Sequence, residues 1–242
     1  KVIDNAEACR SLYGDAVHNI IKSTGIVKRY TCSPGISSLD LCCSAAHQLI
    51  EDCGINLEDI GAVICVTFTP EYFMPCNAVA AQDRLGLSRE IVAFDIGLAC
   101  SGYGYGMWVA SMMSKNLGKK VLLLDGDVQT AFTSPLDKAT FPVMADAGTA
   151  TLISPYNNDD EWIFTFFSDG SRRKLLYIPA GGSGSPVKND DLEYKKFEDG
   201  SCRRNIDIYM DGFGIFKFVA QDASRLLNEF IKMERLNGSI LD

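Results

Sequence analysis

Cys100 is the residue of this sequence that is best placed to do chemistry. It lies in DIGLACSGYGYG, which begins at Asp95, and glycines follow it at positions 102, 104 and 106. The apolar run before it predicts a strand and the segment after it a helix, so we expect the thiol where the strand ends and the helix makes its first turn. Ligands of open α/β sheets bind at that edge, and a helix N-terminus favours an anion such as a thiolate. This setting is typical of a nucleophile.

Two other interpretations of this segment stay open on the residues alone. Free cysteine is among the most buried residue types, so Cys100 can be a structural thiol. A strand, a glycine-rich turn, a helix and a further strand with an acid at Asp125 also imitate a dinucleotide-binding fingerprint. The glycines run GxGxG instead of GxGxxG and fall inside the expected helix, which counts against that interpretation.

The remaining cysteines and histidines do not predict a metal site. The nine cysteines contain no CxxC pair, and only two histidines are present, whereas a zinc site needs closely spaced ligand pairs. Helical spacing puts His18 and His47 on the polar faces of their helices, so both are expected to be surface residues. An odd number of cysteines without a disulfide framework indicates reduced thiols in a cytoplasmic protein.

Composition indicates a globular protein and excludes some partners. Of the 242 residues, 47% are hydrophobic, and 31 acids against 23 Lys and Arg give a net charge of −8. An acidic chain is a poor general ligand for nucleic acid or for an anionic membrane. No apolar run approaches the roughly 20 residues that span a bilayer.

Hydrophobic periodicity predicts helices that alternate with strands. The chain opening is expected to be helical, the second helix to have its N-cap at Ser38 or Asp40, and Gly54 to end it. The strand at 90–97 is expected to be buried. Helices are predicted at 6–22, 38–54, 76–86, 101–118 and 213–234, and strands at 61–69, 90–97, 119–127, 147–154 and, starting at the very end, 237–242. This order predicts a parallel or mixed central sheet with helices on both faces.

Seven segments, in order, resemble one family. AFDIGLACSGYGYGMWVA is similar to the nucleophile segment of β-ketoacyl-acyl carrier protein synthase III, of the thiolase superfamily. The other six segments occupy residues 23–29, 68–87, 119–132, 141–154, 167–183 and 208–224. The resemblance implies an α/β, thiolase-like layered fold with a mixed central sheet. Residues 1–155 would be the nearly complete N-terminal half, carrying the nucleophile, and 156–242 the start of the C-terminal half.

The same resemblance implies an activity. Cys100 would attack an acyl-CoA thioester and hold the acyl group, and its backbone N–H would contribute to an oxyanion hole. Malonyl-acyl carrier protein would then decarboxylate and take the acyl group, which initiates fatty acid biosynthesis. No cofactor is implied, since the coenzyme A thioester is a substrate. The implied partners are acyl carrier protein and a second copy of the chain, paired through the strand at 90–96.

Three further residues match family positions one at a time. Arg29 and Lys138 match cationic positions near the CoA phosphates, although the family usually has arginine at the second one, and lysine loses its bidentate fork. Met74 matches a position that projects across the dimer toward the partner's acyl channel. The alternatives are solvated surface cations for Arg29 and Lys138, and a core side chain for Met74.

The family also uses a histidine and an asparagine from its second half, and neither is found here. We therefore expect a partial synthase that lacks the first strand and most of the second half and that does not catalyse condensation by itself. The alternatives are a starter-unit acyltransferase, a hydroxymethylglutaryl-CoA synthase-like enzyme, and a non-catalytic acyl-binding relative.

Overall fold

The computed structural model describes residues 1–156 and 162–233, so the strand predicted at 237–242 and residue 234, where the last predicted helix ends, lie outside the described residues. The chain forms two compact units. Unit 1 contains residues 1–4, 28–131 and 145–164, and unit 2 contains 5–27, 132–144 and the chain from Thr165 onward.

A four-stranded mixed sheet forms the centre of unit 1, in the order β4-β3-β5-β6. Its strands are β3 (Ile60–Val66), β4 (Val92–Ile96), β5 (Lys120–Val128) and β6 (Asp146–Ile153). β3 pairs in parallel with both β4 and β5, and β6 runs antiparallel to β5. The predicted mixed sheet is confirmed.

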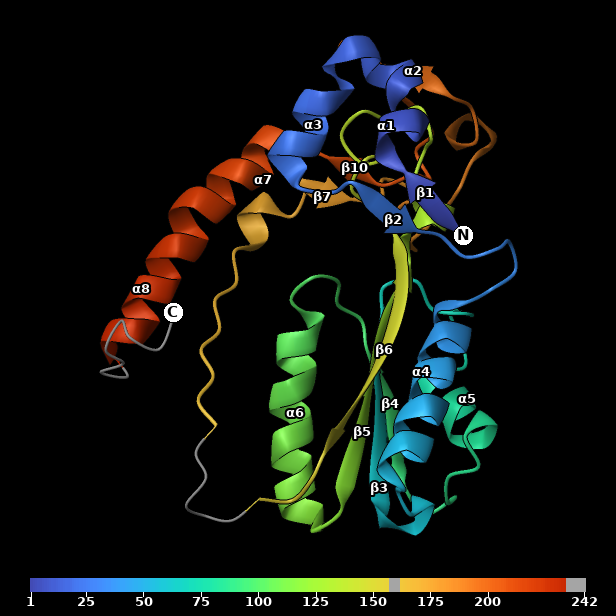
Figure 1. Ribbon diagram of the computed structural model, residues 1–242, viewed down its shortest axis with the longest axis vertical. Helices are drawn as coiled ribbons and strands as arrows, with labels where there is room; N and C mark the ends of the chain where they lie inside the picture. The colour runs from blue at the N-terminus through green and yellow to red at the C-terminus, as the bar shows by residue number, and fades with distance from the viewer. Residues whose placement is uncertain (157–161, 234–242) are drawn as a thin grey trace. The chain divides into compact units, whose positions relative to one another are not determined.

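Helices cover both faces of this sheet, as predicted (Figure 1). α4 (Ser38–Cys53) and α5 (Asn77–Arg84) pack on one face, and α6 (Gly102–Leu117) packs on the other. Successive strand residues point to opposite faces, so Leu122 and Leu124 of β5 join the core under α4, whereas Val121 and Leu123 join the core under α6. This alternation explains why the central strands read as continuous apolar runs.

The start of α4 corrects the predicted N-cap. The N-cap is Ser37, whose hydroxyl accepts a hydrogen bond from the Asp40 backbone N–H, while the Asp40 carboxylate accepts one from the Ser37 N–H. Asp40 is thus the third residue of a capping box. Gly54 ends the helix in the left-handed region, as predicted.

The N-terminal region differs from the single helix predicted there. Residues 2–4 form β1 (Val2–Asp4), which pairs antiparallel with β2 (Lys28–Tyr30), because a strand partner outweighs local helix propensity. The helix predicted at 6–22 is divided into α1 (Asn5–Ala8), α2 (Arg10–Tyr13), a 3₁₀ turn (Gly14–Ala16) and α3 (Val17–Thr24). Gly14, at φ 53°, ends α2 and separates it from α3.

β4 is an edge strand, and its predicted burial is wrong within this chain. β3 lies on one side of it, and no described strand pairs with the other. Val92 is 41% exposed, and the other β4 side chains are half-buried. The strand was predicted to be buried because its sequence is apolar, but one neighbour cannot cover an edge.

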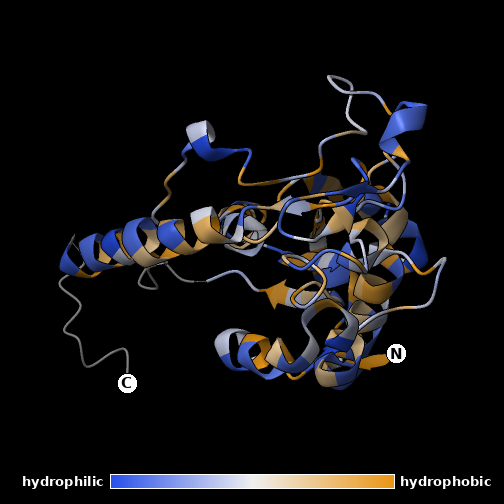
Figure 2. Cartoon of the chain, turned by 90° about the horizontal axis from the view of Figure 1, so that it is seen from above, coloured by the Kyte–Doolittle hydropathy of each residue, from blue (hydrophilic) through white to orange (hydrophobic). Residues whose placement is uncertain are grey.

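Unit 2 holds short strand pairs and a long helical segment. β7 (Leu176–Tyr177) pairs with β10 (Tyr209–Met210), and β8 (Lys195–Lys196) pairs with β9 (Cys202–Arg203). α7 (Gly212–Phe218) continues through a π turn (Val219–Ala223) into α8 (Ser224–Met233), the helix predicted from residue 213. Hydrophilic and hydrophobic residues alternate along this segment (Figure 2).

No helix in the described ranges is both long enough and apolar enough to cross a membrane.

Candidate active site

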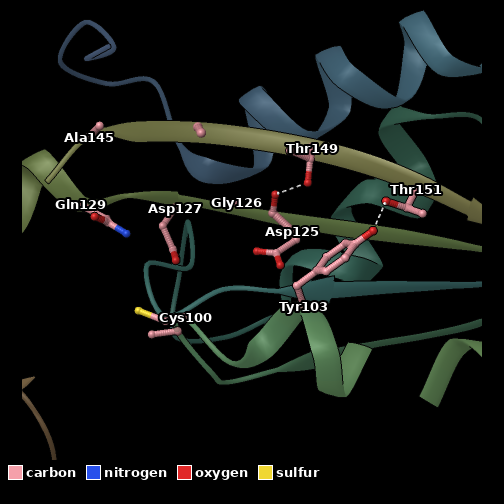
Figure 3. A pocket seen from close by; sticks show the side chains of 11 residues that line it. Cys100, Tyr103, Asp125, Gly126, Asp127, Gln129, Ala145, Thr149 and Thr151 are labelled. Carbon is pink, nitrogen blue, oxygen red and sulfur yellow. Dashed lines mark hydrogen bonds between the residues drawn. The ribbon is translucent and has the colours of Figure 1, made fainter. Parts of the chain in front are cut away.

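Cys100 borders a cavity of about 500 Å³ on the α6 face of the sheet. Its side chain is exposed, and Figure 3 shows it facing the same hollow as Asp125 and Asp127. The lining residues come from the turn before α6, from α6 itself and from the β5–β6 pair: Ala99, Cys100, Tyr103, Asp125, Gly126, Asp127, Gln129, Ala145, Ala147, Thr149 and Thr151. The structural-thiol interpretation, which requires a buried side chain, does not fit.

Close packing of α6 on the sheet sets the position of the Cys100 turn. A Cβ on Gly102 would lie 2.3 Å from Val66 Cγ1, and one on Gly106 would lie 2.7 Å from Leu123 Cδ1. Glycines at these two positions, one helical turn apart, let the helix backbone approach β3 and β5. Because they serve helix–sheet packing, they do not support the dinucleotide-binding interpretation.

The strand before Cys100 is tied to α5 by Asp95. Its two carboxylate oxygens accept hydrogen bonds from the backbone N–H groups of Asn77 and Ala78, each at 2.7 Å, which places negative charge at a helix N-terminus. The chain then turns through Ala99, whose carbonyl accepts a hydrogen bond from the Gly102 N–H at 2.7 Å. The Cys100 N–H makes no hydrogen bond to any other described residue, so it is available to an oxygen in the cavity.

Asp127 fastens the loop after β3 to β5. Its Oδ1 accepts hydrogen bonds from the N–H groups of Phe68 (2.9 Å) and Thr69 (3.2 Å). The hydroxyls of Thr67 (2.7 Å) and Thr69 (3.0 Å) donate to the same oxygen. Burial nevertheless raises the pKa of this carboxyl, against the opposing effect of these donors. Asp127 is therefore a structural clamp at the edge of the cavity.

Asp125 shares the cavity face with Asp127, two residues away on β5. Its carboxyl is half-buried and makes no hydrogen bond or ion pair with any described side chain or backbone group. Burial, and then the charge of Asp127, raise the pKa of this carboxyl.

The other predicted site residues do not line this cavity. Met74 is 85% exposed, which excludes the alternative that it is a core side chain. Arg29, on β2, is only 4% exposed, which excludes a solvated surface cation. Lys138 lies in unit 2, where its Nζ donates to the carbonyl of Asp199 at 3.0 Å.

The two histidines are where the sequence predicts them. His18 on α3 and His47 on α4 are exposed, and neither lines the cavity. Among the described residues, no group of three His, Cys, Asp or Glu side chains gathers as metal ligands would.

The sequence interpretation missed most of the cavity wall. In the sequence, Asp125 fits only the acid of a dinucleotide site, and no motif marks Tyr103, Asp127, Gln129, Thr149 or Thr151. A signal existed in the alternation of β5, where one strand face continues from Leu123 to Asp125 and Asp127. Polar residues at that period, directly after a buried strand, indicate a face turned toward a ligand.

Comparison with known proteins identifies the family. Residues 94–170 match the family model of 3-oxoacyl-[acyl-carrier-protein] synthase III. A β-ketoacyl-[acyl-carrier-protein] synthase III of Rhodopirellula baltica is 32% identical over 256 residues, covering 92% of this chain and 71% of that protein. The chain belongs to the 3-oxoacyl-[acyl-carrier-protein] synthase III family. A synthase III of Campylobacter fetus is 30% identical, covering 92% of this chain and 65% of its own length.

Solved structures of the family share the fold. A crystal structure of a 3-oxoacyl-(acyl-carrier-protein) synthase III has a TM-score of 0.91 and 28% identity, covering 97% of this chain and 70% of that one. A synthase from Burkholderia xenovorans has a TM-score of 0.82 and covers 96% of this chain and 65% of that one. The predicted thiolase-like α/β fold is confirmed. The chain spans only 61% of one synthase III relative and 65% of another.

Proposed function

We propose that this chain forms the acyl-Cys100 intermediate of the synthase III reaction, in which an acyl-CoA starter is condensed with malonyl-acyl carrier protein, and that the condensation step also needs the histidine and asparagine expected from the family's second half. The observation that carries the proposal is the exposed Cys100 thiol, in a cavity at the carboxyl edge of the sheet, in a chain of this family. No cofactor is required, because the thioester supplies both the acyl group and the leaving group.

The first step is a thioester exchange at Cys100. The Cys100 sulfur bonds to the acyl carbonyl carbon, the bond from that carbon to the CoA sulfur breaks, and the thiol proton leaves with the CoA thiolate as free CoA. The unoccupied Cys100 N–H, just before the N-terminus of α6, supports its role as an oxyanion donor.

The condensation step is proposed on family membership. Malonyl-acyl carrier protein loses CO2, and its carbanion attacks the acyl-Cys100 carbonyl, giving a β-ketoacyl product and restoring the cysteine. The starter-unit acyltransferase, hydroxymethylglutaryl-CoA synthase-like and non-catalytic alternatives share the cysteine, and no feature of the structure favours them.

The proposal also assigns residues to substrate binding and to the contact with a second copy of the chain. Arg29 and Lys138 would bind the CoA phosphates, and Met74 would reach toward the acyl channel of a second copy. That copy would pair along the open edge of β4, whose unpaired side supports such a contact. Acyl carrier protein would deliver the malonyl group, and a cytoplasmic location is proposed because all nine cysteines are free thiols.

Intact-mass spectrometry after incubation with acetyl-CoA tests the acyl-enzyme. We expect one acetyl adduct on the wild-type protein and none on Cys100→Ala. Cys53→Ala is the matched control, because Cys53 is also an exposed thiol but lies at the end of α4, and it should keep the adduct. An adduct that survives Cys100→Ala would overturn the assignment.

A further inference from the structure

One face of β5 changes from apolar to polar beyond the N-terminus of α6, where the helix no longer covers the strand. Val121 and Leu123 are buried under the helix, and the residues that continue the same face toward the cavity are Asp125, Asp127 and Gln129. Asp125 pairs with Thr149 of β6, and Asp127 pairs with Ala147. The part of the sheet that the helix leaves open is therefore a polar floor beside Cys100 (Figure 3).

The apolar surface of the cavity wall comes from small groups and one tyrosine ring, with no large aliphatic side chain among its lining residues. None of its lining residues is a Val, Leu, Ile, Met, Phe or Trp. An alkyl chain gains free energy by contact with apolar surface, at roughly 25 cal/mol per Å², but in this cavity it would also cover hydroxyl and carboxyl groups that it cannot bond. Burying such groups without a hydrogen bond is unfavourable.

Several polar groups of the wall already have partners, but the Asp125 carboxyl does not. The Tyr103 and Thr151 hydroxyls lie 3.2 Å apart, the Thr149 hydroxyl donates to the Asp125 backbone carbonyl at 2.9 Å, and Asp127 holds the loop after β3. No described residue donates to or accepts from the Asp125 carboxyl. A ligand that covers this carboxyl removes water from it, so the complex is more stable when the ligand itself forms a hydrogen bond to the carboxyl.

We propose that Asp125 determines specificity for the acyl group on Cys100, favouring a hydroxyl-bearing acyl chain over a plain alkyl chain of equal length. The proposal rests on the proposed function, since it assumes that Cys100 carries the acyl group. An acyl chain bonded to Cys100 begins in the cavity that Asp125 lines. A hydroxyl both donates and accepts, so it bonds the carboxyl whether that group is ionised or protonated. Burial and the Asp127 charge raise the pKa of Asp125, which is consistent with a carboxyl that has no hydrogen-bond donor in the free protein.

A competition experiment on the full protein tests this role. Equimolar 3-hydroxybutyryl-CoA and butyryl-CoA are offered together, and intact-mass spectrometry measures the initial ratio of the two Cys100 adducts. We expect the wild type to favour the hydroxyacyl adduct, and Asp125→Leu to lower the ratio about tenfold, which is the effect of losing about 1.4 kcal/mol. Asp125→Asn, which keeps hydrogen-bonding capacity and a similar shape, should keep most of the preference.

Controls separate the possible failures. Asp52→Leu, which replaces an exposed carboxylate on α4, should leave the ratio unchanged. If Asp125→Leu does not fold, Asp125→Ala is measured in its place with the same expectation. A wild type that favours butyryl, or a ratio that is unchanged in Asp125→Leu or Asp125→Ala, overturns the role of Asp125. A wild type that takes acetyl but neither four-carbon acyl group also overturns the role of Asp125, whereas a wild type that takes no acyl group, acetyl included, overturns the proposed function.

Discussion

At the scale of single residues, Asp125 lines the cavity, and its ionised carboxylate lowers the stability of the folded chain. Its carboxyl has no described partner and lies two residues from Asp127 on the same strand face, so ionisation is unfavourable in the folded chain. Cys100, Tyr103 and Asp127 are the other titratable groups that line the cavity. Groups that bind ligands commonly carry such a penalty, because they are arranged for the complex and not for the free protein.

The pH dependence of stability should show this penalty. Burial and the Asp127 charge raise the pKa of Asp125, so its contribution to stability is fully present below the unfolded pKa, about 4, and is lost as pH rises through the folded value. Asp125→Asn stays uncharged throughout. We therefore expect the variant to have a higher free energy of unfolding than the wild type at pH 7, and the difference to shrink as the pH falls toward 4.

Urea unfolding monitored by circular dichroism across this pH range measures the difference. Asp52→Asn, at an exposed position on α4, is the control and should follow the wild type. Parallel curves for Asp125→Asn and the wild type would contradict the assignment of the penalty to this carboxyl.

At the scale of elements, the contact between α6 and the sheet positions Cys100, the proposed nucleophile. Two of the three glycines after Cys100 face the sheet, where a Cβ on Gly106 would lie 2.7 Å from Leu123 Cδ1 and 3.0 Å from Val66 Cγ2. A Cβ on Gly104 would have no neighbour within 4 Å. Gly102 and Gly106 are therefore required by helix–sheet packing, whereas Gly104 lies on an open surface of the helix.

Alanine substitutions at these positions should have opposite effects. Gly106→Ala forces α6 away from the sheet, and we expect it to lower the free energy of unfolding by about 1–3 kcal/mol. Gly104→Ala adds helix propensity without a clash, and we expect a gain of about 0.5–1 kcal/mol. Equilibrium urea unfolding measures both, and a stabilising Gly106→Ala would contradict the packing argument.

At the scale of the whole molecule, β4 is an edge strand of the central sheet, with no described strand paired on its outer side. An exposed, apolar strand edge is a template for pairing with another chain. The Ile96 carbonyl accepts a hydrogen bond from Thr67, beyond the end of β3. The backbone groups of successive strand residues point to opposite sides, so Ile96 and Phe94 face β3 and Ala93 faces the other way. The N–H of Ala93 therefore points toward the open side of β4.

Blocking this edge should separate the proposed dimer. In sedimentation at micromolar concentration, we expect the wild type at twice the chain mass and Ala93→Pro, which removes the outward N–H, at the chain mass. Ala93→Ser keeps that N–H and should stay dimeric. A monomeric wild type would contradict the dimer, and a dimeric Ala93→Pro would place the contact elsewhere.

Residue type and periodicity within short segments were enough to predict the central strands and the end of α4, because apolar runs and a helix-ending glycine act locally. The runs that became β3 and β5 are apolar, and Gly54 ends α4 where predicted. Pattern failed where pairing partners are distant in sequence. β1 is a strand because β2 is beside it, and α1 begins at Asn5, whose side-chain amide donates to the Pro142 carbonyl at 2.9 Å.

By itself, the sequence determined Cys100 as the candidate nucleophile, the strand before it, the helix after it and the mixed α/β layering, since each follows from residue type and period along a short segment. Only the tertiary structure decided what surrounds Cys100. The register of β6 against β5 brings Thr149 beside Asp125. Because α6 begins only at Gly102, it does not cover that polar face of the sheet. Such neighbours arise from strands that meet across the sheet, and the spacing of residues along one strand does not encode which residue of another strand will lie opposite.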